Sequence, residues 1–120
     1  MKLLVIFPCY NEEDVLTNII HRFFSFFENL IDSETISKDS RICFVDDGSK
    51  DKTWDVIKSF PQEYISAIKF SNNFGHQKAL LAGLECFKNE FDDYVTLDVD
   101  FQDDCNVFTE MESNLGRKKV

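Results

Sequence analysis

Leu3-Leu4-Val5-Ile6-Phe7 is a continuous apolar run that Pro8 follows directly. A strand without polar alternation is typical of the middle of a parallel sheet, where helices cover both faces. Ile42-Cys43-Phe44-Val45 is a second such run, and strand character returns at 65–70 and 94–97. Four strands are therefore expected, the first two of them buried.

Helices are predicted in the segments between these runs, at about 12–30, 53–60 and 76–89, with a last one at 105–115. Asn11 is expected to cap the first helix, and Asp51 or Ser49 the second, because short polar side chains accept hydrogen bonds from the free N–H groups there. Strands alternating with helices predict one α/β domain over 1–120. Its expected form is a three-layer α/β/α sandwich with a mainly parallel sheet.

Charge and cysteine spacing exclude several classes of protein. Thirteen Lys and Arg against 22 Asp and Glu give a net charge of −9, which disfavours nucleic acid as a partner. A divalent metal between carboxylates and phosphates would still allow a phosphorylated ligand. The cysteines have no zinc-site spacing and are interpreted as buried, reduced thiols; they are Cys9, Cys43, Cys86 and Cys105. No export signal or membrane span is evident, so a soluble, cytoplasmic protein is expected.

Polar residues follow three of the four predicted strands, at 8–12, 46–49 and 98–103. Ligands of open parallel sheets bind at the carboxyl ends of the strands. Asp98 and Asp100 are two residues apart and would share a face. Two converging carboxylates favour Mg²⁺ or Mn²⁺, which take oxygen ligands.

Each of these features also has a structural explanation. Asp98 and Asp100 would, in isolation, be interpreted as solvated loop acids, and 46–49 as a turn with a helix cap. Tyr10 would serve packing, and His76 would be a hydrogen-bonded structural residue. The aromatic residues at 23–27 are interpreted as core, with a partner surface as the alternative.

Four motifs, taken in order, resemble the family 2 glycosyltransferases of the GT-A fold. They are Pro8-x-Tyr10-Asn11-Glu12, Val45-Asp46-Asp47-Gly48-Ser49, Asn73-Phe74-Gly75-His76 and Asp98-x-Asp100-x-Gln102-Asp103. The likeness is closest to enzymes that load a sugar onto a polyisoprenyl phosphate, of the dolichol-phosphate mannosyltransferase-like and bactoprenol glucosyltransferase-like kinds. It implies transfer of a sugar from a UDP- or GDP-sugar, with Mg²⁺ or Mn²⁺ as cofactor.

The resemblance also implies roles for single residues. The nucleotide would be bound by Pro8, Tyr10, Glu12, Asp47 and Asp98, with Asp47 hydrogen-bonded to the base. The metal would be held by Asp98 and Asp100. Gln102 and Asp103 would face the sugar or the acceptor. Asp103 is the catalytic candidate within the chain, and the general base is expected beyond Val120.

The chain departs from the family pattern in three places. Asn72 stands where many relatives have arginine, and 104–106 replaces two prolines and a glutamate. Family members continue for a hundred or more residues, so the chain is expected to be incomplete on the acceptor side.

Several alternatives stay open at this stage. A non-catalytic nucleotide-sugar-binding fragment of the same fold is one, and a receiver-like signalling domain is a more distant one. The choice of base, sugar and acceptor is open, as are attachment to the cytoplasmic face of a membrane and pairing of sheet edges into a homo-oligomer.

Overall fold

The structure, a computed structural model, describes residues 1–97. Four strands form its sheet: β1 (Leu3–Cys9), β2 (Arg41–Asp46), β3 (Ile65–Lys69) and β4 (Asp93–Thr96). Three helices alternate with them: α1 (Glu13–Asp32), α2 (Thr53–Ser59) and α3 (His76–Cys86). The predicted helix at 105–115 lies outside the described residues.

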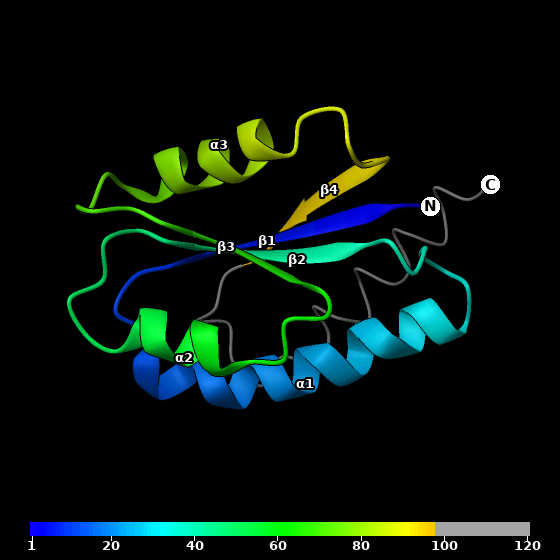
Figure 1. Cartoon of the computed structure of the whole chain (residues 1–120), viewed down its shortest axis with the longest axis horizontal. Coiled ribbons are helices and arrows are strands. Elements are labelled where there is room, and N and C mark those ends of the chain that lie inside the picture. The colour runs from blue at the N-terminus through cyan, green and yellow to red at the C-terminus, as the bar shows by residue number, and fades with distance from the viewer. Residues whose placement is uncertain (98–120) are drawn as a thin grey trace.

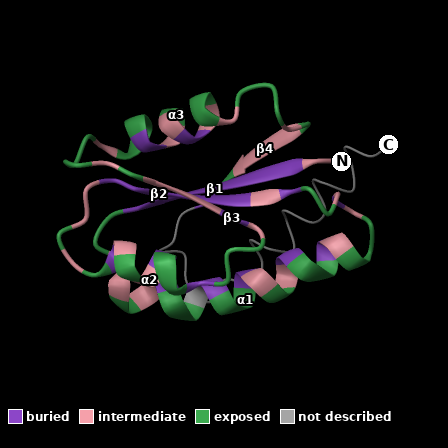
Figure 2. Ribbon diagram, in the orientation of Figure 1, coloured by how far each residue is buried: buried purple, intermediate pink, exposed green. Residues whose placement is uncertain are grey.

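The sheet of the described residues is entirely parallel and has the strand order β3-β2-β1-β4. Helices α1 and α2 cover one face and α3 the other (Figure 1). The predicted three-layer sandwich with a parallel sheet is thus confirmed. β1 lies between β2 and β4, which explains why all seven of its residues are buried (Figure 2).

Alternate residues of the central strands enter two separate cores, because successive side chains of a strand point to opposite faces. Val5 and Phe7 pack with α1 and α2, whereas Leu4 and Ile6 pack beneath α3. The first core is aromatic at its centre: the Phe7 ring lies 5.0 Å from that of Phe23, edge to face, and 5.3 Å from that of Phe44, stacked. Such pairs add stability beyond the area they bury.

The aromatic run of α1 is core, as interpreted from the sequence. Phe23 and Phe27 are fully buried, and Phe24 and Phe26 are partly buried against the same cluster. One long amphipathic helix therefore covers the sheet with a single face.

Two sequence-based expectations about α3 are wrong. The helix ends at Cys86 and not near Asn89, whose φ of 68° is left-handed and incompatible with a continuing α-helix. Cys86 itself is exposed at the helix end, whereas Cys9 and Cys43 are buried as expected. Cys105 lies outside the described residues.

No helix within residues 1–97 is both long and apolar enough to cross a membrane.

Candidate functional site

Three segments meet at the carboxyl ends of β1, β2 and β3. They include the last strand residues of β1 and β2 and are 8–13, 46–53 and 70–76, called here the strand-end segments. The N–H of Asp47 donates to the carbonyl of Cys9 at 2.8 Å, and the N–H of Phe70 donates to the carbonyl of Asp46 at 2.9 Å. These bonds extend the sheet by one step beyond its strands. Two of the three polar segments predicted to lie together, 8–12 and 46–49, are therefore side by side; the third, 98–103, lies outside the described residues.

Asn11 links the first strand-end segment to the second. Its N–H donates to Ser49 Oγ at 2.9 Å, and its Oδ1 accepts from the N–H of Lys50 at 2.9 Å. Asn11 was expected to cap α1, and that prediction is wrong. Its φ is 52°, a left-handed turn that asparagine tolerates, and the helix begins two residues later with Glu12 as the capping position.

Asp51 satisfies the first N–H group of two helices at once. Its Oδ2 accepts from the N–H of Glu13 at 3.3 Å, at the start of α1, and its Oδ1 accepts from the N–H of Thr53 at 2.9 Å, at the start of α2. A carboxylate is favoured at both places because helix N-termini carry partial positive charge. The capping position of α2 is Lys52, and not Asp51 or Ser49 as expected, but Asp51 supplies the side-chain acceptor for the first N–H group of α2 and of α1.

Partial burial raises the pKa of Asp51, but the hydrogen bonds from Thr53 and Glu13 outweigh it and leave that pKa below its ordinary value of 3.8. Asp51 is therefore ionised wherever the site would function near neutral pH.

Asp47 holds the third strand-end segment. Its Oδ1 accepts from the N–H of Phe74 at 2.8 Å; its Oδ2 accepts from the N–H of Gly75 at 3.0 Å and from Asn73 Nδ2 at 3.1 Å. These donors lie immediately before α3, which has no acidic residue in its first turn. The buried carboxylate of Asp47 supplies the negative charge there.

Asp46, the neighbour of Asp47, points to the other side of the strand and is fully buried. Its Oδ1 accepts from the N–H of Ser49 at 3.0 Å and closes the turn, while Oδ2 has no hydrogen-bond partner within residues 1–97. Burial is the largest cause that raises the pKa of the Cys9 thiol, and the nearby charge of Asp46 is the second. The thiol therefore stays protonated. The two acidic residues of the motif thus have different surroundings.

Residues predicted to bind the nucleotide occupy the first two strand-end segments. Pro8 is buried in β1 opposite Val45, Tyr10 is 40% exposed, and Glu12 is half-buried at the start of α1. Asp98, Asp100, Gln102 and Asp103 lie outside the described residues. Within residues 1–97 no three His, Cys, Asp or Glu side chains are grouped to hold a metal ion.

An exposed aromatic ring borders the site. Phe74 is 50% exposed, its ring lies edge to face against Phe70 with centroids 5.6 Å apart, and the ammonium group of Lys78 lies 5.7 Å from its centroid. His76 is exposed at the start of α3. Neither contact of Phe74 was predicted from the sequence, because the motif at 73–76 indicated a family and not the surroundings of this ring.

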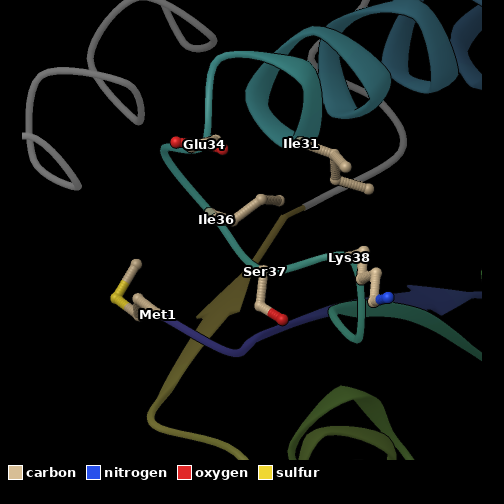
Figure 3. A pocket seen from close by; sticks show the side chains of 6 residues that line it. All are labelled: Met1, Ile31, Glu34, Ile36, Ser37 and Lys38. Carbon is tan, nitrogen blue, oxygen red and sulfur yellow. The ribbon is translucent and has the colours of Figure 1, made fainter.

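A pocket of about 330 Å³ lies at the opposite end of the sheet (Figure 3). Six residues line it: Met1, Ile31, Glu34, Ile36, Ser37 and Lys38. It opens beside the start of β1, where the N–H of Ser37 donates to the carbonyl of Met1. Ligands of such sheets bind at the carboxyl ends, so this pocket is not the predicted site.

The comparison of sequences decides the family. A sequence model described as "Glycosyl transferase family 2" matches residues 4–118. The chain belongs to this family. The resemblance inferred from the four motifs is thereby confirmed.

Three curated proteins are similar in sequence to this family 2 chain. It is 44% identical over 107 residues to "Uncharacterized glycosyltransferase YkoT" of Bacillus subtilis, covering 88% of this chain and 32% of that protein. It is 34% identical over 101 residues to "Undecaprenyl-phosphate 4-deoxy-4-formamido-L-arabinose transferase" of Pectobacterium carotovorum, covering 82% and 28%. It is 33% identical over 109 residues to "Bactoprenol glucosyl transferase" of Shigella phage SfX, covering 89% and 33%. The chain thus spans about a third of the length of these relatives.

A solved structure shows the same fold. Residues 1–349 of S. aureus TarS in complex with UDP superimpose on this chain with a TM-score of 0.59 at 24% identity, covering 83% of this chain and 28% of that one. At this level of identity the likeness supports the GT-A fold and not a shared substrate.

Proposed function

We propose that this family 2 segment binds the nucleotide part of a UDP- or GDP-sugar, in a metal-dependent glycosyltransferase that transfers the sugar to an acceptor. The observation that carries the proposal is the hydrogen-bonded junction of the three strand-end segments. It brings Tyr10, Glu12 and Asp47 to one end of a parallel sheet, where nucleotides bind in α/β folds.

Pro8, Tyr10, Glu12 and Asp47 are the proposed base and ribose contacts on the described side of the site. The exposed ring of Tyr10 offers a stacking face, and carboxylates accept hydrogen bonds from base N–H groups. Asp47 already accepts three hydrogen bonds from 73–75, so it has room for about one more on its two oxygens. A base bound there would therefore also contact the segment that Asp47 holds.

Asp98 and Asp100 remain the proposed metal ligands, with Asp98 also proposed to contact the ribose. Leu97, the last described residue, donates its N–H to the carbonyl of Ile6 at 3.0 Å, and β4 runs parallel to β1 toward the same end of the sheet. Carboxylate donors suit Mg²⁺ or Mn²⁺. The bound ion would neutralise charge on the leaving diphosphate as a Lewis acid.

The remaining assignments concern the acceptor. Gln102 and Asp103 are proposed to face the sugar or acceptor, and a polyisoprenyl phosphate is the proposed acceptor because two relatives are named for undecaprenyl-phosphate and bactoprenol transfer. Reaction at the cytoplasmic face of a membrane is the setting that such an acceptor implies. A single domain over 1–120 and pairing of exposed sheet edges between copies stay predictions.

Calorimetric titration with UDP, GDP and their glucose and mannose derivatives, with and without Mn²⁺, tests the proposal. Metal-dependent binding of one nucleotide by the parent chain is expected, with at least tenfold weaker binding by Tyr10→Ala and Asp100→Ala, about 1.4 kcal/mol each. Asp39→Ala is the matched control, since it removes an exposed carboxylate before β2 at the far end of the sheet. Absence of any nucleotide binding would contradict the proposal, and binding without transfer would favour a non-catalytic module.

A further inference from the structure

The residues between β1 and α1 have no regular structure of their own. Tyr10 and Glu12 flank Asn11, whose left-handed φ of 52° reverses the chain locally. Such a short segment keeps one conformation only if neighbouring groups hold it, because each freely rotating residue gains conformational entropy. The groups that hold it come from a different part of the chain, 38 to 41 residues later.

Thr53 is the buried centre of these contacts. Its Oγ1 accepts a hydrogen bond from the N–H of Glu12 at 2.8 Å and donates its own proton to Asp51 Oδ1. Since the hydroxyl proton is committed to Asp51, a lone pair of the oxygen is left for Glu12. Asp51 thus orients the hydroxyl, and it also holds the N–H of Glu13 with its second oxygen.

Asn11 adds two hydrogen bonds between the same two segments. Its N–H donates to Ser49 Oγ, and its Oδ1 accepts from the N–H of Lys50. The N–H groups of residues 11, 12 and 13 each donate to a different side chain of 49–53. Three consecutive donors bound in this way leave the intervening peptides little freedom. The segment that carries Tyr10 and Glu12 is therefore placed by the loop after β2.

We propose that Thr53 and Asp51 are positioning residues of the nucleotide site, an inference that rests on the proposed function. They touch no ligand themselves. They fix the peptides of Glu12 and Glu13, and through them the place of the Tyr10–Glu12 segment beside the end of β2. Without this junction the segment has to be ordered when the nucleotide binds, and the affinity falls by the cost of that ordering.

If Thr53 had only a structural role, its replacement would have different effects. It would lower the temperature of unfolding but leave the affinity for the nucleotide unchanged at temperatures where every variant is folded. A positioning role lowers the affinity of the fully folded protein and raises hydrogen exchange at the particular amides that Thr53 and Asp51 hold. The two roles are separated by measuring both quantities on the same samples.

The experiment compares Thr53→Val, which removes the hydroxyl at nearly the same size, with Thr53→Ser, which keeps it. Thr17→Val removes a hydroxyl from an exposed position on α1 and serves as the matched control. Amide exchange is followed by NMR in the nucleotide-free chain, and nucleotide affinity by calorimetry with Mn²⁺. Thr53→Val is expected to raise exchange at Glu12 at least tenfold and to weaken binding about tenfold, whereas Thr53→Ser and Thr17→Val stay near the parent.

Asp51→Ala is a second, independent variant, useful because Thr53 is buried and its replacement risks the fold. Faster exchange at Glu13 together with weaker binding is expected from it. Unchanged exchange at Glu12 in Thr53→Val, or at Glu13 in Asp51→Ala, overturns the inference even if the parent chain binds no nucleotide. Failure of the parent to bind contradicts the proposed function instead, and faster exchange with unchanged affinity overturns the positioning role alone.

Discussion

Asp47 Oδ1 lies 2.8 Å from the backbone nitrogen of Phe74, which comes 27 residues later in the chain. This hydrogen bond joins the end of β2 to the segment before α3. Because the carboxylate is buried and charged, its bonds to N–H groups are of the strong kind. The second aspartate of the motif at 46–49 therefore has a structural role whether or not it also contacts a base.

Replacing Asp47 by alanine is expected to lower the free energy of unfolding by about 2–3 kcal/mol, because donors of Asn73, Phe74 and Gly75 lose a charged acceptor. Asp47→Asn keeps one acceptor oxygen and is expected to lose less. Urea unfolding followed by circular dichroism measures both. Asp39→Ala, at the far end of the sheet, is expected to change stability by less than about 0.5 kcal/mol. Equal stability of Asp47→Ala and the parent would show that these hydrogen bonds contribute nothing.

Gly48 is expected to tolerate no side chain. Its φ is 71°, and a Cβ built there would lie 2.3 Å from the carbonyl carbon of Asn72 and 2.5 Å from the nitrogen of Asn73. Gly48→Ala should therefore destabilise the chain by about 2–4 kcal/mol, from backbone strain and from displacement of the 72–73 peptide.

Gly75→Ala is the matched comparison for Gly48→Ala. The φ of Gly75 is 103°, but a Cβ there meets no atom within 4 Å. It should cost about 1–3 kcal/mol through backbone strain alone. In NMR spectra, Gly48→Ala should shift the amide resonances of Asn72 and Asn73 more than Gly75→Ala does, because the methyl group added at Gly75 causes no clash. Unmoved resonances in Gly48→Ala would contradict the close approach of these two segments.

The fold was predictable because its strong signals are local. The apolar run before Pro8 and the helical spacing of the long first helix are each visible within one window of sequence, and both elements are present. Element ends were predicted less well. Asparagine is compatible with both the helical and the left-handed conformation, so the sequence alone did not decide that Asn89 ends the helical path.

The sequence predicts at which end of the sheet the candidate residues lie, but not their hydrogen-bond partners. The motifs locate Tyr10, Glu12 and Asp47 at strand ends, because parallel strands bring their carboxyl ends to one edge. The partners of Asp47 lie 26 to 28 residues away in sequence, so only the folded chain reveals them. The different environments of Asp46 and Asp47 arise because adjacent residues face opposite sides of the sheet. The sequence predicts Asp51 as a cap for the helix at 53–60. Its hydrogen bond from the N–H of Glu13 depends on tertiary structure and was not predicted.

Phe7 is expected to be a sensitive position of the core. Its ring contacts those of Phe23 and Phe44 on neighbouring elements, so Phe7→Ala leaves a cavity that both must border. The expected loss is about 3–5 kcal/mol in the free energy of unfolding. Leu81→Ala serves as the control because Leu81 is 54% exposed on α3, and it should stay within about 0.5 kcal/mol of the parent. A similar loss in both variants would contradict the assignment of the core.

The thiols should differ sharply in reactivity toward iodoacetamide. Burial raises the pKa of the Cys43 thiol to about 12, and burial with the nearby charge of Asp46 raises that of Cys9. Only the thiolate reacts, so both should stay unmodified at pH 8 in the folded chain, while exposed Cys86 is alkylated. Peptide mapping by mass spectrometry distinguishes the three sites. In urea all of them should react, and early alkylation of Cys43 without denaturant would contradict its burial.

Asp51 should make stability depend on pH in a specific acidic range. Its pKa in the folded chain is lower than the ordinary 3.8, so the folded state favours the ionised form relative to the unfolded chain. Its stabilising contribution is therefore complete above the unfolded pKa and is lost as the pH falls through the lowered folded pKa. The difference in unfolding free energy between the parent and Asp51→Asn should be constant above about pH 5 and shrink below about pH 4.

Urea titrations of the parent and Asp51→Asn between pH 2.5 and 7, roughly the range in which carboxylates titrate, measure this difference directly. Asp39→Asn is the matched control, because it removes an exposed carboxylate that lies before β2, at the opposite end of the sheet from the two helix N-termini. Hydrogen exchange at Glu13 adds a local readout, since protonated Asp51 is a weaker acceptor for that amide. Exchange at Glu13 should therefore accelerate, after correction for intrinsic pH dependence, in the same acidic range. A stability difference that persists unchanged to pH 2.5 would mean that the charge of Asp51 does not stabilise the two helix ends it joins.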